Sequence, residues 1–160
     1  MYNLRWDGYD PLTVKSLIYR AEIYIMSRYP NLAQVNSNSE GISQKVSENA
    51  KFFVIKSFNE EDVHKAIKYS LWSSTKAGNK TLSEAFAETK EKGGEVYLIF
   101  SCNGSGRYIG VAKMLSKVNE TKEFNYWTQD AKWQGLFDVE WIFIKDIPFK
   151  CFKMVNIFMK

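Results

Sequence analysis

The chain has 160 residues, of which 45% are hydrophobic and 25% charged, a composition typical of one folded domain with a sizeable core. No apolar run approaches the roughly 20 residues that span a bilayer, and no signal-peptide core follows Met1, so we expect an intracellular protein or an excised domain. The net charge is +4 and its excess lies in residues 51–160, with 17 basic and 13 acidic side chains, which weakly favours a polyanionic partner.

Residues 1–44 form an N-terminal extension whose role the sequence does not indicate. Within it, residues 14–29 carry apolar side chains on most faces and suit a helix or a strand. Residues 30–45 are rich in Asn and Ser and predict a linker or flexible loop. We therefore place the folded domain at residues 45–160.

The pattern becomes regular from Lys51 onward. Residues 51–58 predict a short buried strand. Asn59 then caps a predicted helix over 60–72, whose first turn is acidic, as the helix dipole favours. Three residues at helical spacing predict its core face: Val63, Ile67 and Leu71. A second helix is expected over 81–92, where two glycines end it.

The C-terminal half of the domain predicts strands. Residues 95–102 and 107–115 predict an antiparallel pair around a turn at 103–106. A polar loop follows, then a strand over 136–144 and a turn at 146–149. The order β-α-α-β-β-loop-β indicates an α+β domain, with a mixed, curled sheet or open barrel and flanking helices.

No residue pattern indicates catalysis. His64 lies on the solvent side of its predicted helix and has no partner marked by a motif. The turn at 103–106 lacks the lysine and the following helix of a phosphate-binding loop. Cys102 and Cys151 lack metal-ligand spacing, so we expect reduced thiols in the core. These patterns therefore give no indication of an enzyme or of a metal site.

The tryptophans are the unusual feature. Trp141 lies among apolar strand residues and is expected in the core, whereas Trp127 and Trp133 lie in a polar loop and Trp72 ends a predicted helix where hydroxyl residues follow. Two such rings on a loop fit core packing and an exposed site equally well. Three rings at the ends of elements, in a basic domain, favour a recognition pocket.

Several segments, in the same order, resemble the YTH domain over about residues 51–148: KFFVIKSF, DVHKAIKYSLWSST, GNKTL, EVYLIFSCNGSGRYIGVAKM and YWTQDAKWQGLFDVEWIFIKDIP. Within that family the chain is most similar to the cytoplasmic branch, which includes fungal proteins with a single YTH domain. The resemblance implies a PUA-like curled sheet with flanking helices that reads N6-methyladenosine in single-stranded RNA. It also implies a protein without catalytic activity or cofactor that recruits mRNA-fate machinery through effector proteins. We expect a monomer in the cytoplasm, with the nucleus as the alternative, and no membrane partner.

The resemblance also assigns roles to individual positions. Three side chains would form a cage around the methylated base: Trp72, Trp127 and Trp133. Four residues would contact the base edge: Phe58 through its backbone amide, Asp62, Ser73 through its carbonyl, and Asn103. Two lysines would contact the RNA backbone: Lys56 and Lys80. The segment between Trp127 and Trp133 is one residue longer than in some relatives.

Two other interpretations stay open at the level of sequence. Aromatic cages also hold methylated cations, and Asp130 lies in the tryptophan loop, so a reader of methyl-lysine or methyl-arginine peptides is one alternative. The other is a degenerate copy with little binding. Relatives continue past the last predicted strand with a further strand, an RNA-contacting segment and a helix, so we expect a C-terminally shortened domain ending at Lys160.

Overall fold

The computed structural model describes residues 46–129 and 133–152, with Phe152 described by its backbone alone. The N-terminal extension 1–44 and the tail after residue 152 lie outside these ranges. The described elements follow one another along the chain as predicted in type, except that β2 was expected to be the end of a helix and η3 was not expected. They are β1 (Lys51–Ser57), α3 (Glu60–Tyr69), β2 (Leu71–Trp72), α4 (Lys76–Glu91), β3 (Val96–Cys102), β4 (Arg107–Met114), β5 (Phe137–Pro148) and the 3-10 helix η3 (Phe149–Phe152).

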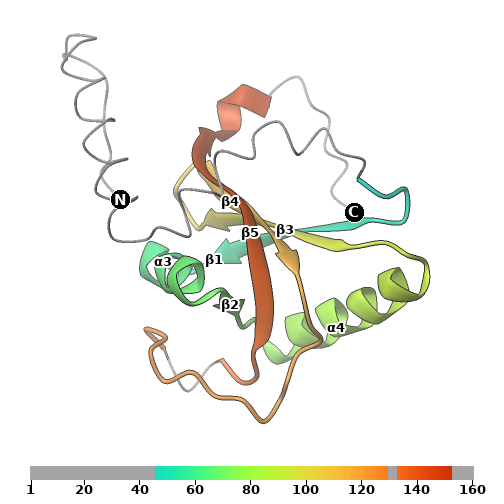
Figure 1. The fold of residues 1–160 in the computed structure, drawn as a ribbon. Coiled ribbons are helices and arrows are strands. Elements are labelled where there is room, and N and C mark those ends of the chain that lie inside the picture. The colour runs from blue at the N-terminus through green and yellow to red at the C-terminus, as the bar shows by residue number, and fades with distance from the viewer. Residues whose placement is uncertain (1–45, 130–132, 153–160) are drawn as a thin grey trace, which may run out of the picture.

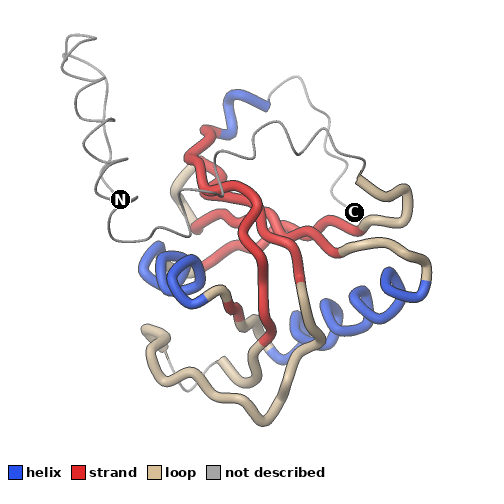
Figure 2. Tube along the Cα trace, in the orientation of Figure 1, coloured by secondary structure: helices blue, strands red, loops and turns tan. Residues whose placement is uncertain are grey.

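The strands form one mixed sheet in the order β1-β3-β4-β5-β2, with β1 parallel to β3 and the other pairs antiparallel. Helices α3 and α4 lie on either side of the short β2, and a long loop connects β4 to β5 below them (Figures 1 and 2). Irregular register within β3–β4 and β4–β5 adds local twist, which bends the sheet. The predicted α+β architecture with a curled, mixed sheet is therefore confirmed.

Helix α3 begins as predicted but ends three residues early. Asn59 has extended backbone angles, and its side chain accepts the Asp62 N–H at 2.8 Å, as an N-cap should. The helix stops at Tyr69 because Ser70 adopts a left-handed conformation, with φ 54° and ψ 43°. Trp72 then pairs with Phe137 of β5. The prediction of a helix over 60–72 was wrong at its end because a strand pairing outweighs the helical spacing.

Helix α4 begins five residues before the predicted start at residue 81. Thr75 is its N-cap and accepts the Gly78 N–H at 3.1 Å. Glycine and asparagine in the first turn are poor helix formers, which hid this turn in the sequence. Gly78 is nonetheless suited to its position, because a Cβ there would lie 2.3 Å from Ser74 Oγ. The helix ends as predicted, before Gly93 with φ +68°.

Strand β5 is longer than predicted. It was expected to end near residue 144, with a turn at 146–149, but it continues to Pro148, which lies opposite Arg107 of β4. The turn prediction was wrong because the pairing with β4 extends to the start of that strand. The Phe149 N–H then donates to the Gly106 carbonyl at 2.9 Å and closes this end of the sheet.

The core lies between the sheet and the two helices. Val63 is fully buried, and Ile67 and Leu71 pack against the core, as their spacing predicted. Trp141 is also a core residue, as expected, and its indole Nε1 donates to the Ala66 carbonyl at 3.1 Å, which joins β5 to α3. Cys102 is buried, but Cys151 lies exposed in η3, so the expectation of a core position was wrong for the second cysteine.

Glu88 of α4 joins two segments through lysines. Its carboxylate bonds Lys51 at the start of β1, and Lys92 donates to it at 2.8 Å. These two hydrogen bonds lower the Glu88 pKa from 4.5 to about 2. A carboxyl group whose pKa is lowered on folding stabilises the fold above its unfolded pKa, and this contribution is lost as the pH falls through the folded pKa.

We therefore expect Glu88→Gln to weaken the acid sensitivity of the fold. Between pH 4.5 and pH 2 the urea midpoint of the wild type should fall more steeply than that of the variant. At neutral pH the wild type should have the higher midpoint, by an amount that solvent screening of this exposed group keeps small, and the two midpoints should converge near pH 2. Urea denaturation at a series of pH values measures this, and equal slopes in the acid range would contradict it.

Candidate nucleic-acid interface

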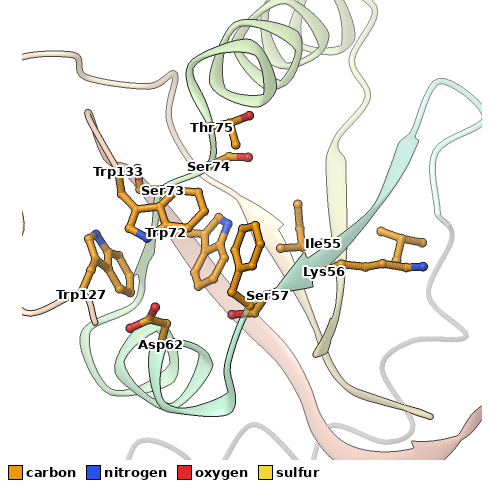
Figure 3. Close-up of a pocket in the computed structure, with 12 residues that line it drawn as sticks. Ile55, Lys56, Ser57, Asp62, Trp72, Ser73, Ser74, Thr75, Trp127 and Trp133 are labelled. Carbon is orange, nitrogen blue, oxygen red and sulfur yellow. The ribbon is translucent and has the colours of Figure 1, made fainter. Parts of the chain in front are cut away.

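A cavity of about 130 Å³ lies where the end of β1, the start of α3, β2 and the β4–β5 loop meet (Figure 3). Seven of the nine predicted site residues line it, together with neighbours from β1 and from the segment before α4. The lining consists of Val54, Ile55, Lys56, Ser57, Phe58, Asp62, Trp72, Ser73, Ser74, Thr75, Trp127 and Trp133.

Trp72 and Trp127 form the buried side of the cavity. Their rings meet edge to face, with centroids 5.4 Å apart and planes at 73°. Only 6% of Trp72 and 5% of Trp127 is exposed. Trp72 also packs edge to face on Phe100 of β3, and its backbone is held in the ladder with β5. This wall is therefore part of the core as well as of the cavity.

Trp133 and Phe58 form a second aromatic pair on the cavity. Trp133 is partly buried, and its ring centroid lies 5.6 Å from that of Phe58, with planes at 43°. Phe58 is half exposed. The resemblance assigned a role to the backbone amide of Phe58 alone. The structure also places the Phe58 ring against Trp133. The sequence did hold a signal for this ring, because Phe58 is an aromatic residue at the end of a predicted strand.

Asp62 is a buried carboxylate whose oxygens face the tryptophan loop. Oδ1 accepts the Thr128 N–H at 3.0 Å, and Oδ2 accepts the Thr128 hydroxyl at 2.8 Å. Asn59 Nδ2 donates to Oδ2 at 3.2 Å, and Lys65 Nζ lies 3.8 Å from Oδ1. The acidic first turn of α3, whose Asp62 the resemblance assigned to the base edge, therefore also fastens the loop beside Trp127.

Asn79 is a site residue that the sequence did not reveal. It is buried in the first turn of α4, and its Oδ1 accepts the Ser74 N–H at 2.9 Å. Its Nδ2 donates to the Gln134 carbonyl at 2.8 Å. Asn79 thus connects the segment after Trp72 with the residue after Trp133. A buried polar residue with a partner 55 positions away leaves no local pattern.

Ser73 is buried on the cavity, and its hydroxyl has no hydrogen-bond partner among the residues that the structure describes. The same holds for the indole Nε1 of both Trp72 and Trp127. Buried polar groups are usually satisfied, so a site with three unsatisfied ones is atypical of plain core packing. This favours a binding site over the interpretation of the rings as core alone.

The remaining predicted positions lie farther out. Lys56 is exposed at the cavity, and its side chain extends away from the three tryptophans (Figure 3). Lys80 is exposed on α4, 4.0 Å from Glu84, and is not part of the lining. Asn103 is exposed in the β3–β4 turn, where its N–H donates to the Ser57 carbonyl at 2.9 Å, and it too lies outside the lining.

Other kinds of site are not evident in the described residues. Within residues 46–129 and 133–152, no group of three His, Cys, Asp or Glu side chains is arranged to hold a metal ion. His64 is exposed on α3, as its spacing predicted. No helix of the described part is both long and apolar enough to cross a bilayer. Asp130, the acidic residue that suggested a cation cage, lies outside the described residues.

Comparison with known proteins gives a consistent family. The model of the YT521-B-like domain, YTH, matches residues 50–159. YTH domain-containing protein ECT3 of Arabidopsis thaliana is 54% identical over 101 residues, which cover 62% of this chain and 20% of the relative. Mouse YTH domain-containing family protein 1 is 53% identical over 98 residues, covering 61% and 17%. The chain thus spans about a fifth of the length of these relatives.

Solved structures agree with this assignment. The YTH domain of Zygosaccharomyces rouxii MRB1, solved in complex with N6-methyladenosine RNA, is 39% identical with a TM-score of 0.63, over 68% of each chain. The Pho92 YTH domain in complex with m6A is 38% identical with a TM-score of 0.62, again over 68% of each. A cavity walled by three tryptophans, at the end of a curled mixed sheet, accompanies these matches. The chain belongs to the YTH domain family.

Proposed function

We propose that this chain binds N6-methyladenosine in single-stranded RNA by inserting the methylated base into the cavity between Trp72, Trp127 and Trp133. The observation that carries the proposal is that three tryptophans, up to 61 positions apart in the sequence, line one cavity. Family membership supports it, because the MRB1 and Pho92 domains were solved with this modified base.

The chemistry of the lining suits a neutral methylated purine. Burying one methyl group contributes about 0.8 kcal/mol, and stacking a base on an aromatic ring about 1–3 kcal/mol. The Ser73 carbonyl would accept the one remaining N6 hydrogen. An unmethylated adenine would place a second N–H donor against the rings without a partner, at about 1–3 kcal/mol. The difference between the two bases is then about 2–4 kcal/mol, or about 30- to 1000-fold in affinity.

The RNA must be single-stranded at the modified position, because the base has to leave its stack to enter the cavity. Lys56 at the edge of the cavity, with its side chain directed away from the rings, is suited to a phosphate next to the bound base. Phosphate contacts make binding weaken with salt, by about 0.7 log units of affinity per contacted phosphate for each tenfold increase.

A methylated lysine is less well suited to the same cavity. A cation cage normally offers an acidic group to the ligand, and Asp62 is the carboxylate in the lining. Both of its oxygens already accept hydrogen bonds from Thr128, and Asn59 donates to one of them. Both oxygens of the carboxylate are therefore occupied within the protein, which disfavours a bound cation and also counts against the base-edge contact expected of Asp62.

We also propose that the chain acts as a reader and not as an enzyme, and that it affects transcripts through effector proteins. Support comes from its family and from Asp62, the carboxylate of the lining, whose two oxygens both accept hydrogen bonds from Thr128.

The proposal predicts selective binding by the wild-type chain. Short single-stranded RNAs that differ in one N6-methyl group should differ at least about 30-fold in affinity, measured by fluorescence anisotropy. A trimethyl-lysine peptide in excess should not displace the methylated RNA. Equal affinity for the two RNAs would overturn the proposal, and displacement by the peptide would redirect it to methylated cations.

A further inference from the structure

The two loop tryptophans share a local arrangement. Each is followed directly by a residue that is hydrogen-bonded to the beginning of a helix. Thr128 follows Trp127 and contacts the first turn of α3, while Gln134 follows Trp133 and contacts the first turn of α4. Residues 130–132, between the two contacts, are outside the described ranges. The loop is therefore attached on both sides of this segment, at the positions next to the rings.

The first attachment, which we call the α3 clamp, consists of Asn59, Asp62 and Thr128. Besides the two bonds from Thr128 to Asp62, Asn59 Nδ2 donates to the Thr128 hydroxyl oxygen at 2.6 Å. The Asp62 side chain is only 5% exposed, and hydrogen bonds to a buried carboxylate are among the stronger ones in proteins. Asn59 caps the helix through Oδ1 at the same time. The residues that start α3 thus also fix the backbone directly after Trp127.

The second attachment, the α4 clamp, is Asn79 with its two partners. The Asn79 residue is 6% exposed, and each end of its amide has one partner, the Ser74 N–H and the Gln134 carbonyl. One side chain therefore sets the distance between the floor of the cavity after Trp72 and the wall at Trp133. If either partner moved, a buried amide group would be left unsatisfied.

Apolar packing alone would leave the rings less well defined. Trp127 packs on Phe124 with centroids 4.7 Å apart, and Phe124 packs on Tyr69 at 5.2 Å. Such contacts hold a ring in the core, but the hydrophobic effect is non-directional. Hydrogen bonds to helix starts add the direction that a slot for a single methyl group requires.

We propose that Thr128 and Asn79 are positioning residues, whose clamps hold the Trp127 and Trp133 walls in their binding geometry before a base enters. The inference rests on the proposed function. A binding-competent geometry that is populated only in part raises the apparent Kd by the inverse of its population. Preformed walls avoid this loss, and they also avoid the ordering of a loop at the moment of binding.

Thr128→Val and Thr128→Ser form a matched pair for the α3 clamp. Valine keeps the shape and the backbone N–H bond to Asp62 but removes the hydroxyl that bonds both Asp62 and Asn59. We expect about tenfold weaker binding of the methylated RNA by the valine variant, with affinity for unmethylated RNA unchanged. The serine variant keeps the hydroxyl and should bind within about twofold of the wild type.

Asn79→Asp tests the α4 clamp. The aspartate still accepts the Ser74 N–H, but it presents an acceptor to the Gln134 carbonyl, so the contact beside Trp133 is repelled. The expected result is again about tenfold weaker binding of methylated RNA, with the unmethylated RNA unaffected. Unfolding midpoints of all three variants show whether the fold is kept.

Hydrogen exchange of the RNA-free wild type tests the α3 clamp without any variant. The Thr128 amide, which donates to Asp62, should be protected as strongly as amides inside α3. Rapid exchange at this amide would overturn the inference for the α3 clamp, whatever the variants do.

The outcomes separate the inference from the function on which it rests. If the wild type prefers methylated RNA and both Thr128→Val and Asn79→Asp keep that preference, the proposed positioning roles are overturned and the proposed function stands. Equal loss for methylated and unmethylated RNA would show a general structural role and would also overturn them. If the wild type shows no preference, the proposed function is overturned, and the positioning roles with it.

Discussion

Trp72→Ala is expected to remove the preference for methylated over unmethylated RNA. The ring supplies one wall of the cavity, and it also packs on Trp127 and Phe100, so its loss opens the slot on its buried side. The affinity that remains should come from phosphate contacts and be equal for the two RNAs. Anisotropy titrations with both RNAs, at low and high salt, measure this directly.

Stability has to be followed in the same experiment. Truncating a buried tryptophan costs about 3–5 kcal/mol, a large part of the 5–15 kcal/mol that holds a typical domain. Trp141→Phe is a suitable control, because Trp141 is equally buried, 6% exposed, but does not line the cavity. The control should lower the unfolding midpoint and keep the preference. A folded Trp72→Ala that still prefers methylated RNA would contradict the proposed site.

Gly110→Ala is expected to give one of the largest losses of stability for so small a change. A Cβ at this position in β4 would lie 2.4 Å from the Phe143 carbonyl oxygen and 3.0 Å from the Trp141 ring. The first neighbour is backbone of β5, so the two strands would have to separate at their irregular pairing. Overpacking of this kind costs about 1–3 kcal/mol, and we expect the upper part of that range.

Gly104→Ala is the control for Gly110→Ala, because it changes the backbone preference without adding a steric clash. Gly104 has φ +75° in the β3–β4 turn, but no atom lies within 4 Å of a Cβ there. This variant should lose about 1–2 kcal/mol, the preference of an alanine against the left-handed conformation. Urea denaturation of both variants gives the comparison. A Gly110→Ala variant as stable as Gly104→Ala would show that β4 and β5 separate easily.

The sequence predicted the elements well and their ends less well. Strands and helices were recognisable because spacing, caps and turns are local, as Asn59 and the glycines after α4 illustrate. The end of α3 was not, because Trp72 is held by Phe137 of β5, a partner that local spacing does not reveal. The same reason explains why β5 extends past its expected turn to pair with the start of β4.

The same distinction holds for the site: the type of a side chain can be read from the sequence, whereas its partners in the fold cannot. Tryptophans in polar segments were visible as candidates, and the structure brings all three to one cavity. Thr128 and Asn79 were not visible, because an ordinary threonine and asparagine acquire their role from partners 66 and 55 positions away. Lys80 and Asn103 show the converse, since both were chosen by resemblance and lie outside the lining.

The parallel pairing of β1 with β3 has a consequence for how the domain is made. Everything between these strands, including β2 with Trp72, belongs to one crossover, whereas Trp127 and Trp133 follow β4. During synthesis the N-terminal part emerges first, and such non-local pairing forms slowly. A chain in which β5 has not yet reached β2 lacks the wall that Trp72 provides.

Under the proposed function, methylated RNA therefore recognises only the completed domain, and its binding is linked to global folding. At a free concentration of 100 times Kd, such a ligand raises the free energy of unfolding by about 2.7 kcal/mol. A transcript that carries the mark would thus also protect its reader from unfolding and proteolysis.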